Sequence, residues 1–144
     1  MDNTMNPALL ERVPTPTTNR ARWIGRGLSG LPILFLTFDA AIKLLNRPEV
    51  AEASARLGLP SEGSFSVGLG VTSLGCLILY LLPRTAALGA VLLTGYLGGA
   101  VLAHLRIADP LFSHTLFPIY VGALLWAGLY LRDPRVRELL QARH

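Results

Sequence analysis

Four apolar stretches, each close to the length of a membrane-spanning helix, constrain this chain more than any other feature of its sequence. They are residues 27–45, 64–82, 85–105 and 111–131. A helix needs about 20 apolar residues to cross about 30 Å of hydrocarbon. Hydrophobic residues make up 51% of the chain and charged residues only 15%, and the mean hydropathy is +0.46. The sequence therefore predicts an all-α membrane protein with a bundle of four transmembrane helices.

The four stretches define one transmembrane domain, residues 24–132, with a polar segment on each side. Residues 1–23 are polar and rich in proline and threonine towards their end, and we expect them to form a disordered tail. Residues 133–144 form a second tail. No small-residue cleavage site follows the first apolar stretch, so we expect that stretch to be a retained span and not a signal peptide.

The basic residues indicate how the domain crosses the membrane. Nine of the thirteen lie in the two tails, at the start of the first stretch, between the second and third stretches or at the end of the fourth, and the other four are Lys43, Arg47, Arg56 and Arg106. The positive-inside rule therefore places both tails in the cytoplasm, and the basic excess indicates topology and not binding of nucleic acid. Four aromatic residues fall near the cytoplasmic ends of the spans, as in an aromatic belt: Trp23, Tyr80, Trp126 and Tyr130.

The outer connection between the first two stretches is expected to form a short helix. Pro48 suits a first helical turn, Glu52 and Arg56 have the spacing of an ion pair, and Gly58 followed by Pro60 favours a stop. We interpret residues 48–57 as an interfacial spacer helix, which is the usual fate of such segments. The alternative is a lid over a pocket.

Small residues recur at four-residue spacing in the third stretch, at Gly95, Gly99 and Ala103. Such rows let helix backbones approach closely in lipid, where packing replaces the hydrophobic driving force. We therefore expect a helix–helix contact face here. Its partner is a helix of the same chain or a second copy, which leaves a homo-oligomer open.

Asp39 and Lys43 place an acid and a base one helical turn apart inside the first stretch. Their order favours an intrahelical ion pair, and in the simplest interpretation the two charges only neutralise each other. A charge inside the bilayer costs at least ~2.5–3.5 kcal/mol on insertion scales, so ionisable residues there typically mark a functional site. Lys43 can also extend to the outer surface, whereas the shorter Asp39 cannot. Both are candidate catalytic residues.

More polar residues gather where the third stretch ends and the fourth begins: His104, Arg106, Asp109 and His114. The titration range of histidine suits His104 to proton transfer, and the other three are candidate ligand-binding residues. In the alternative, His104 caps its helix and Arg106 pairs with Asp109. Neither H-x3-H nor H-E-x-x-H spacing is present, which does not favour a metal or haem site.

Tyr96 falls near the middle of the membrane on the same helical face as His104. Its hydroxyl needs a partner there, and Ser73 or a bound ligand would serve, so both are candidate ligand-binding residues. Together the polar residues of three regions predict a pocket with a polar outer end and an apolar inner end.

Two segments carry a resemblance to a known family. They are FLTFDAAIKLL and YLLPRTAALGAVLLTGYLGGAVLAHLRIADPLFSHTLFPIYVGALLWAGLYLRDPRVRELL. The chain from Arg26 to Leu140 resembles the DoxX-like family of small four-helix proteins of the bacterial inner membrane. The resemblance points to ten positions: Asp39, Lys43, Tyr96, Gly98, Gly99, His104, Arg106, Asp109, Pro110 and His114. The chain departs from it at Ser73, where relatives often carry a carboxylate.

The family takes its name from a membrane subunit of a thiosulfate:quinone oxidoreductase, and similar proteins are linked to thiol and oxidative-stress handling. The resemblance therefore implies a membrane subunit or accessory protein in quinone-linked redox chemistry, with a quinone in the pocket and a redox protein as partner. A second hypothesis is an intramembrane acid–base enzyme, such as an isomerase, a cyclase or an epoxide-opening enzyme, acting on a hydrophobic small molecule. A third is a non-catalytic assembly or interaction factor.

Overall fold

The computed structural model of the protein describes residues 19–141, and over that range it is helical with no β-strand. Its elements are four long helices, one π-helical turn and two short helices: α1 (Asn19–Leu44), α2 (Pro48–Arg56), α3 (Gly63–Leu81), α4 (Ala86–Arg106), η2 (Leu111–Thr115), α5 (Phe117–Arg132) and α6 (Pro134–Gln141). Four segments are long and apolar enough to cross a membrane, namely α1, α3, α4 and the run from η2 through α5. The prediction of a four-span bundle with a short helix after the first span is confirmed.

Three of the spans begin and end within one residue of their expected bounds, but the first is longer than expected. It begins at Asn19, so residues 19–23, expected in the disordered tail, are helical. No proline interrupts this stretch, and the Arg26 guanidinium lies 5.3 Å from the centre of the Trp23 ring, a contact one helical turn apart. Residues 1–18 of the expected tail lie outside the described residues.

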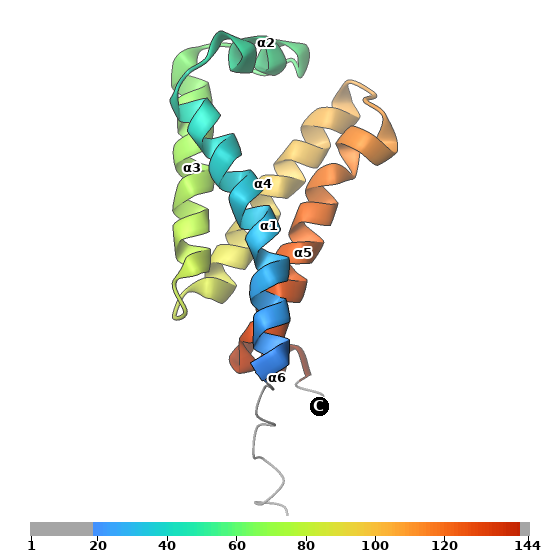
Figure 1. Cartoon of the computed structure of the whole chain (residues 1–144). Helices are drawn as coiled ribbons and strands as arrows, with labels where there is room; N and C mark the ends of the chain where they lie inside the picture. The colour runs from blue at the N-terminus through green and yellow to red at the C-terminus, as the bar shows by residue number, and fades with distance from the viewer. Residues whose placement is uncertain (1–18, 142–144) are drawn as a thin grey trace, which may run out of the picture.

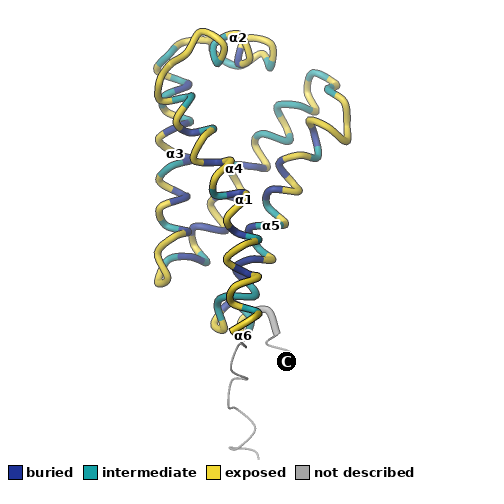
Figure 2. The backbone as a smooth tube through the Cα atoms, viewed as in Figure 1, coloured by how far each residue is buried: buried dark blue, intermediate teal, exposed yellow. Residues whose placement is uncertain are grey.

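The four long helices form a closed ring in which each packs against two neighbours (Figure 1). Around the ring the order is α1, α3, α4 and α5, and α5 returns to α1. Buried residues follow the inward side of each helix, as Figure 2 shows. Large apolar side chains such as Leu34 (70% exposed) and Leu102 (67% exposed) point outward, where lipid would cover them.

The ring is closed tightly towards the end that carries α6 and the start of α1, which we call the α6 end. Gly25 of α1 and Gly128 of α5 let their backbones touch, because a Cβ on Gly25 would lie 2.9 Å from the Gly128 oxygen. Gly89 of α4 is pressed in the same way against the α3 backbone at Tyr80. Small residues therefore do bring helices together in this protein, at this end.

Tyr80 joins three helices inside the closed part of the ring. Its side chain is 0% exposed, and its hydroxyl donates to the Leu125 carbonyl oxygen at 2.8 Å. Because that proton is used, the Ser29 hydroxyl donates to the Tyr80 oxygen, at 2.9 Å. The expectation that Tyr80 belongs to an interfacial belt is therefore wrong. The residue lies in the core because two internal partners satisfy its hydroxyl, so it needs no contact with water.

The opposite end, which we call the α2 end, is covered by α2 (Figure 1). The connection leaves this helix at Gly58, whose φ of +63° is strained for residues with a side chain. Arg106, at the end of α4, donates to the carbonyl oxygens of Leu57 and Gly58 at 2.8 and 2.7 Å. A Cβ on Gly58 would collide with this guanidinium. Two hydrogen bonds from Arg106 thus hold the C-terminal turn of α2 against the end of α4.

The ion pair expected between Glu52 and Arg56 does not form among the described residues. Arg47 contacts Glu49 instead, at 3.5 Å, at the start of α2. Exposed pairs gain little Coulomb energy in water and lose side-chain entropy, so the spacing alone does not enforce them.

Candidate functional site: a cavity beneath α2

A cavity of about 680 Å³ lies between α1, α3, α4 and α5, beneath α2. This volume is within the range of about 300–1,000 Å³ that is usual for small-molecule sites. Most of its wall is apolar, and all five helices contribute: Phe35, Leu36, Ile42, Val50, Ala53, Leu57, Leu59, Phe65, Leu69, Leu97, Phe117, Pro118 and Val121. The spans therefore border a partly open chamber that suits an apolar or amphipathic molecule.

Four of the residues proposed from the sequence lie on the wall of this cavity: Asp39, Lys43, Tyr96 and His104. Asp39 and Lys43 form the intrahelical ion pair that their spacing predicted, with side chains 22% and 19% exposed. A pair held this way keeps both charges at the cavity wall, because each partner offsets part of the desolvation cost of the other. The ammonium group keeps N–H donors for a ligand, since one carboxylate oxygen uses only one of its three.

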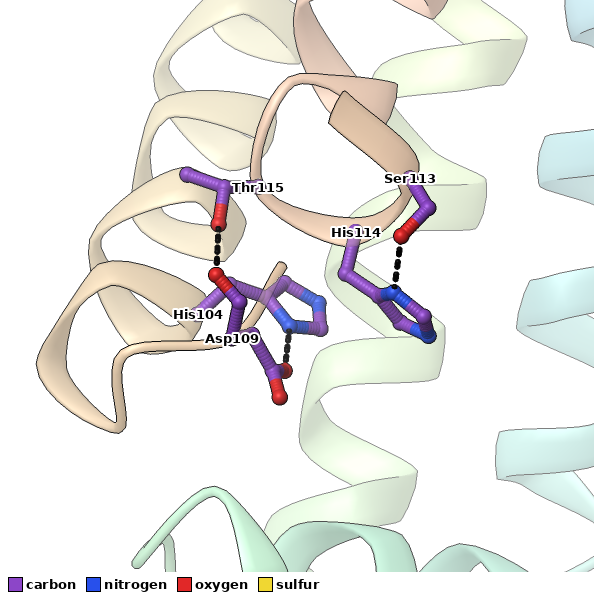
Figure 3. Close-up of polar contacts among 5 residues, drawn as sticks. All are labelled: His104, Asp109, Ser113, His114 and Thr115. Atoms are coloured by element: carbon purple, nitrogen blue, oxygen red, sulfur yellow. Dashed lines mark hydrogen bonds and ion pairs between the residues drawn. The ribbon is translucent and has the colours of Figure 1, made fainter. Parts of the chain in front are cut away.

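His104 is oriented by Asp109, as Figure 3 shows. The distance from His104 Nδ1 to Asp109 Oδ2 is 2.6 Å. An ionised carboxylate only accepts hydrogen bonds, so Nδ1 carries the proton and Nε2 is the nitrogen left for other partners. The turn after α4 produces this contact, because Ala108 adopts a φ of +54° and the Asp109 N–H returns to the His104 carbonyl at 3.2 Å.

Arg106 and His114 do not reach the cavity. The alternative in which Arg106 pairs with Asp109 is wrong, because Arg106 is bound to the end of α2. His114 is exposed in the turn η2, where its Nδ1 lies 2.8 Å from the Ser113 hydroxyl (Figure 3). Its ring centre is 6.1 Å from that of His104, so the two rings are neighbours without a hydrogen bond.

Tyr96 and Ser73 lie close to each other and near the ion pair of Asp39 and Lys43. The Tyr96 hydroxyl is within electrostatic range of Lys43, Asp39 and Ser73. Ser73 itself is fully buried, does not line the cavity, and its hydroxyl has no hydrogen-bond partner within residues 19–141. Of the two, only Tyr96 is placed to touch a molecule in the cavity.

The small residues of α4 make room for the cavity instead of contacting a helix. Gly95, Gly99, Ala100 and Ala103 all line it. A Cβ added to Gly95 or Gly99 would meet no atom within 4 Å. The expectation of a helix–helix contact face is therefore wrong within this chain, because α4 diverges from α1 at this end and leaves a space between them (Figure 1).

Sequence reasoning missed the part of the wall that α2 and the aromatic residues supply. Glu49 and Ser54 of α2 line the cavity, which supports the lid alternative over the favoured spacer. Phe35 and Phe117 meet edge to face with ring centres 4.9 Å apart. Phe35 precedes Asp39 by four residues and so shares its helical face, which is the signal that would have found it.

The pKa of Glu49, at the start of α2, departs from its ordinary value. Its pKa is lowered, first by hydrogen bonding to the backbone at the start of α2 and then by Arg47. The cavity is therefore bordered by a second carboxylate besides Asp39. Residues 19–141 hold no group of three or more His, Cys, Asp or Glu side chains placed to bind a metal ion.

Comparison with known proteins identifies a family whose model matches this chain. The model of the DoxX-like family matches residues 27–128, a range that reaches all four spans and contains Asp39, Lys43, Tyr96 and His104. No curated protein and no solved structure matches the chain. Because the family match covers most of the sequence and its four apolar helices, the protein belongs to the DoxX-like family.

Proposed function

We propose that the cavity binds the ring of a quinone, and that the protein is a membrane subunit or accessory protein in quinone-linked redox chemistry. The observation that carries the proposal is the chamber of about 680 Å³ itself, with apolar walls and a few converging polar groups. A binding site for an amphipathic ring needs that combination. The chain belongs to the DoxX-like family, and that family takes its name from a quinone-linked enzyme subunit, which supports the same ligand class.

The polar groups fit the chemistry of such a ring. A quinone offers two carbonyl oxygens that accept hydrogen bonds, and the wall offers donors in the Lys43 ammonium and the Tyr96 hydroxyl. The T-shaped pair of Phe35 and Phe117 offers aromatic edges against which a ring can pack. When bound, the quinone supplies the redox chemistry, and the chain supplies orientation and protons.

His104 is the residue that would hold a proton at the cavity. Asp109 fixes the His104 ring through Nδ1, which leaves Nε2 as the nitrogen that can exchange a proton with a bound molecule. Asp39 has a different part, because its ion pair keeps Lys43 in place. We therefore assign Lys43 and Tyr96 to binding, His104 to proton exchange and Asp39 and Asp109 to positioning these groups.

Two neighbouring glycines of α4 test the proposal sharply. Gly98 and Gly99 each have no atom within 4 Å of an added Cβ, but only Gly99 lines the cavity. Decylubiquinone is titrated into the purified protein by calorimetry. We expect Gly99→Leu to weaken binding by at least about tenfold, since the added side chain occupies the ring's space, and Gly98→Leu to stay within about twofold of wild type.

Equal affinities of Gly99→Leu and Gly98→Leu would show that decylubiquinone binds elsewhere on the protein. A wild-type protein that does not bind decylubiquinone would refute the proposal directly. Circular dichroism and size-exclusion profiles of both variants establish that they fold.

The pair of His104 and Asp109 supports a second candidate, an intramembrane acid–base enzyme acting on a hydrophobic small molecule. A carboxylate that orients a histidine beside an apolar chamber is the minimal equipment for proton transfer. An enzyme that moves protons between solvent and its substrate would introduce deuterium into that substrate in D₂O. Membrane lipid extracts incubated with the protein in D₂O would gain deuterium in one component with wild type and not with His104→Gln.

The topology completes the proposal. We place the protein in the bacterial inner membrane with the α6 end in the cytoplasm, because that end carries most of the basic residues. The cavity then lies near the outer surface, beneath α2, where an extracytoplasmic redox partner protein would have access to it.

A further inference from the structure

The α6 end of the bundle contains a second cavity, of about 590 Å³, which differs from the first in its charge. Five arginines from four separate segments line it: Arg22 and Arg26 of α1, Arg84 between α3 and α4, Arg132 at the end of α5 and Arg135 of α6. Its apolar floor is made by Leu81, Ala86 and Leu129. Figure 1 shows that these segments meet at one end of the molecule.

Among residues 19–141, the wall of this cavity carries one carboxylate against the five guanidinium groups. That carboxylate, Asp133, accepts a hydrogen bond from the backbone N–H of Arg135 at 3.0 Å, at the start of α6. The ion pairs of Asp39, Glu49 and Asp109 lie elsewhere, on α1, at the start of α2 and after α4. The positive charge of the lining is therefore not balanced by the acids that line it.

Two of these arginines are held by uncharged neighbours. The Arg132 guanidinium lies 4.6 Å from the centre of the Tyr80 ring and donates to the Tyr80 carbonyl oxygen at 3.1 Å. Arg26 lies over Trp23, a ring that is 69% exposed at the outside of α1. Contacts with rings and carbonyls orient a guanidinium group and leave its charge in place for an anion.

The position of the cavity along the helices indicates the class of anion that suits it. It lies where α3 and α5 end and α4 begins, and Trp23 beside it is of the residue type that sits among lipid headgroups. A basic cavity between transmembrane helices at this depth suits a lipid headgroup, and the planar fork of arginine matches the oxygens of a phosphate. A chain that only needed a topology signal would not need its arginines gathered around one hollow.

We propose that the arginine cavity binds the phosphate group of an anionic phospholipid. A soluble phosphate ion presents the same chemistry, and the experiment separates the two sources. The full-length protein, purified in a neutral detergent, is titrated with the anionic lipid phosphatidylglycerol and with zwitterionic phosphatidylcholine. Native mass spectrometry counts the lipids that each protein retains, and inorganic phosphate is added as a competitor.

The test variant is Arg84→Gln with Arg135→Gln, which removes two exposed cavity arginines and leaves Arg132 and its contacts intact. The matched control is Arg20→Gln with Arg56→Gln, which removes two exposed charges from outside the cavity. We expect the test variant to bind phosphatidylglycerol about thirtyfold more weakly than wild type, with phosphatidylcholine unaffected and the control within about twofold. Arg84→Lys keeps the charge without the fork and is expected to lie in between.

Three results would overturn the proposal. Equal losses in the test and control variants would reduce the effect to general electrostatic attraction. Equal retention of phosphatidylglycerol and phosphatidylcholine by wild type would show that the cavity does not select an anionic lipid. Displacement of phosphatidylglycerol by inorganic phosphate at low millimolar concentration would assign the cavity to a soluble phosphate. Matching thermal unfolding of all variants shows that a loss of lipid is not a loss of fold.

Discussion

Tyr80 shows how one side chain can hold this bundle together in the absence of a hydrophobic driving force. Its hydroxyl links α3 to α1 and α5 through Ser29 and the Leu125 carbonyl. We expect Tyr80→Phe to lower the free energy of unfolding by about 1 kcal/mol, because the Leu125 carbonyl loses its side-chain donor inside the core. Unfolding by sodium dodecyl sulfate, followed by circular dichroism, measures the change.

Tyr120→Phe is the control, since Tyr120 is 47% exposed and makes no side-chain hydrogen bond within the described chain. It should change the unfolding free energy by less than about 0.5 kcal/mol. A Tyr80→Phe variant as stable as this control would show that packing of the ring, and not its hydroxyl, holds the three helices.

The contacts made by single residues at the cavity beneath α2 are of two kinds, those that the local sequence could predict and those that it could not. The ion pair of Asp39 and Lys43 was predictable because both partners lie on one helix, four residues apart. The contact between His104 and Asp109 was not predictable, because it depends on the turn at Ala108. This residue has a positive φ, which its residue type does not predict. Proximity in sequence suggested Arg106 as the partner of Asp109, and only the fold shows where Arg106 goes.

Among the elements, α2 is the one that covers the end of the cavity beneath it, and a contact with α4 holds it there. It lines the chamber, and Arg106 fastens its C-terminal turn through two hydrogen bonds. We expect Arg106→Ala to speed hydrogen exchange of the α2 backbone amides by roughly five- to thirtyfold, since two charge-assisted bonds that oppose opening are lost. Exchange followed by mass spectrometry on peptides from residues 47–60 measures this.

Arg56→Ala is a suitable comparison for that experiment, because it removes an exposed arginine of α2 itself that makes no hydrogen bond with the described residues. Its amides should exchange at nearly the wild-type rate. If both variants exchanged alike, α2 would be held by its apolar contacts and not by Arg106.

The helices themselves were largely predictable, whereas the faces they present were not. Apolar length gives the four spans, and Pro48 with Gly58 gives α2. A row of small residues, however, permits close approach without requiring it. Gly25, Gly89 and Gly128 meet neighbouring backbones, while Gly95 and Gly99 face the cavity. The two groups of glycines differ because the helices are close at the α6 end and diverge towards the α2 end. A local sequence pattern does not predict that divergence.

The bundle as one body is closed at the α6 end and hollow beneath α2, with a basic cavity at one end and a mainly apolar one at the other. Both ends of the described chain lie at the α6 end (Figure 1). The topology that we propose predicts an active alkaline phosphatase when it is fused after Ser61, between α2 and α3, and an inactive one when it is fused after His144. Green fluorescent protein at the same positions should give the reverse pattern.

The opposite result for both fusions would invert the bundle and place the α2 end in the cytoplasm. It would leave the fold and both cavities as described, because none of them depends on orientation. It would remove the access of an extracytoplasmic partner from the proposed function.

The part of the wall that α4 gives to the cavity beneath α2 limits how substitutions can alter the size of the ligand. Gly95 and Gly99 expose bare backbone to the chamber, so truncation to alanine, the usual survey of a binding site, has nothing to remove there. Every substitution at these positions adds atoms. The upper limit on ligand size along this wall is therefore set by the main chain, and sequence variation can only narrow the chamber from that side. Relatives that differ at these two positions should differ in ligand size in one direction only.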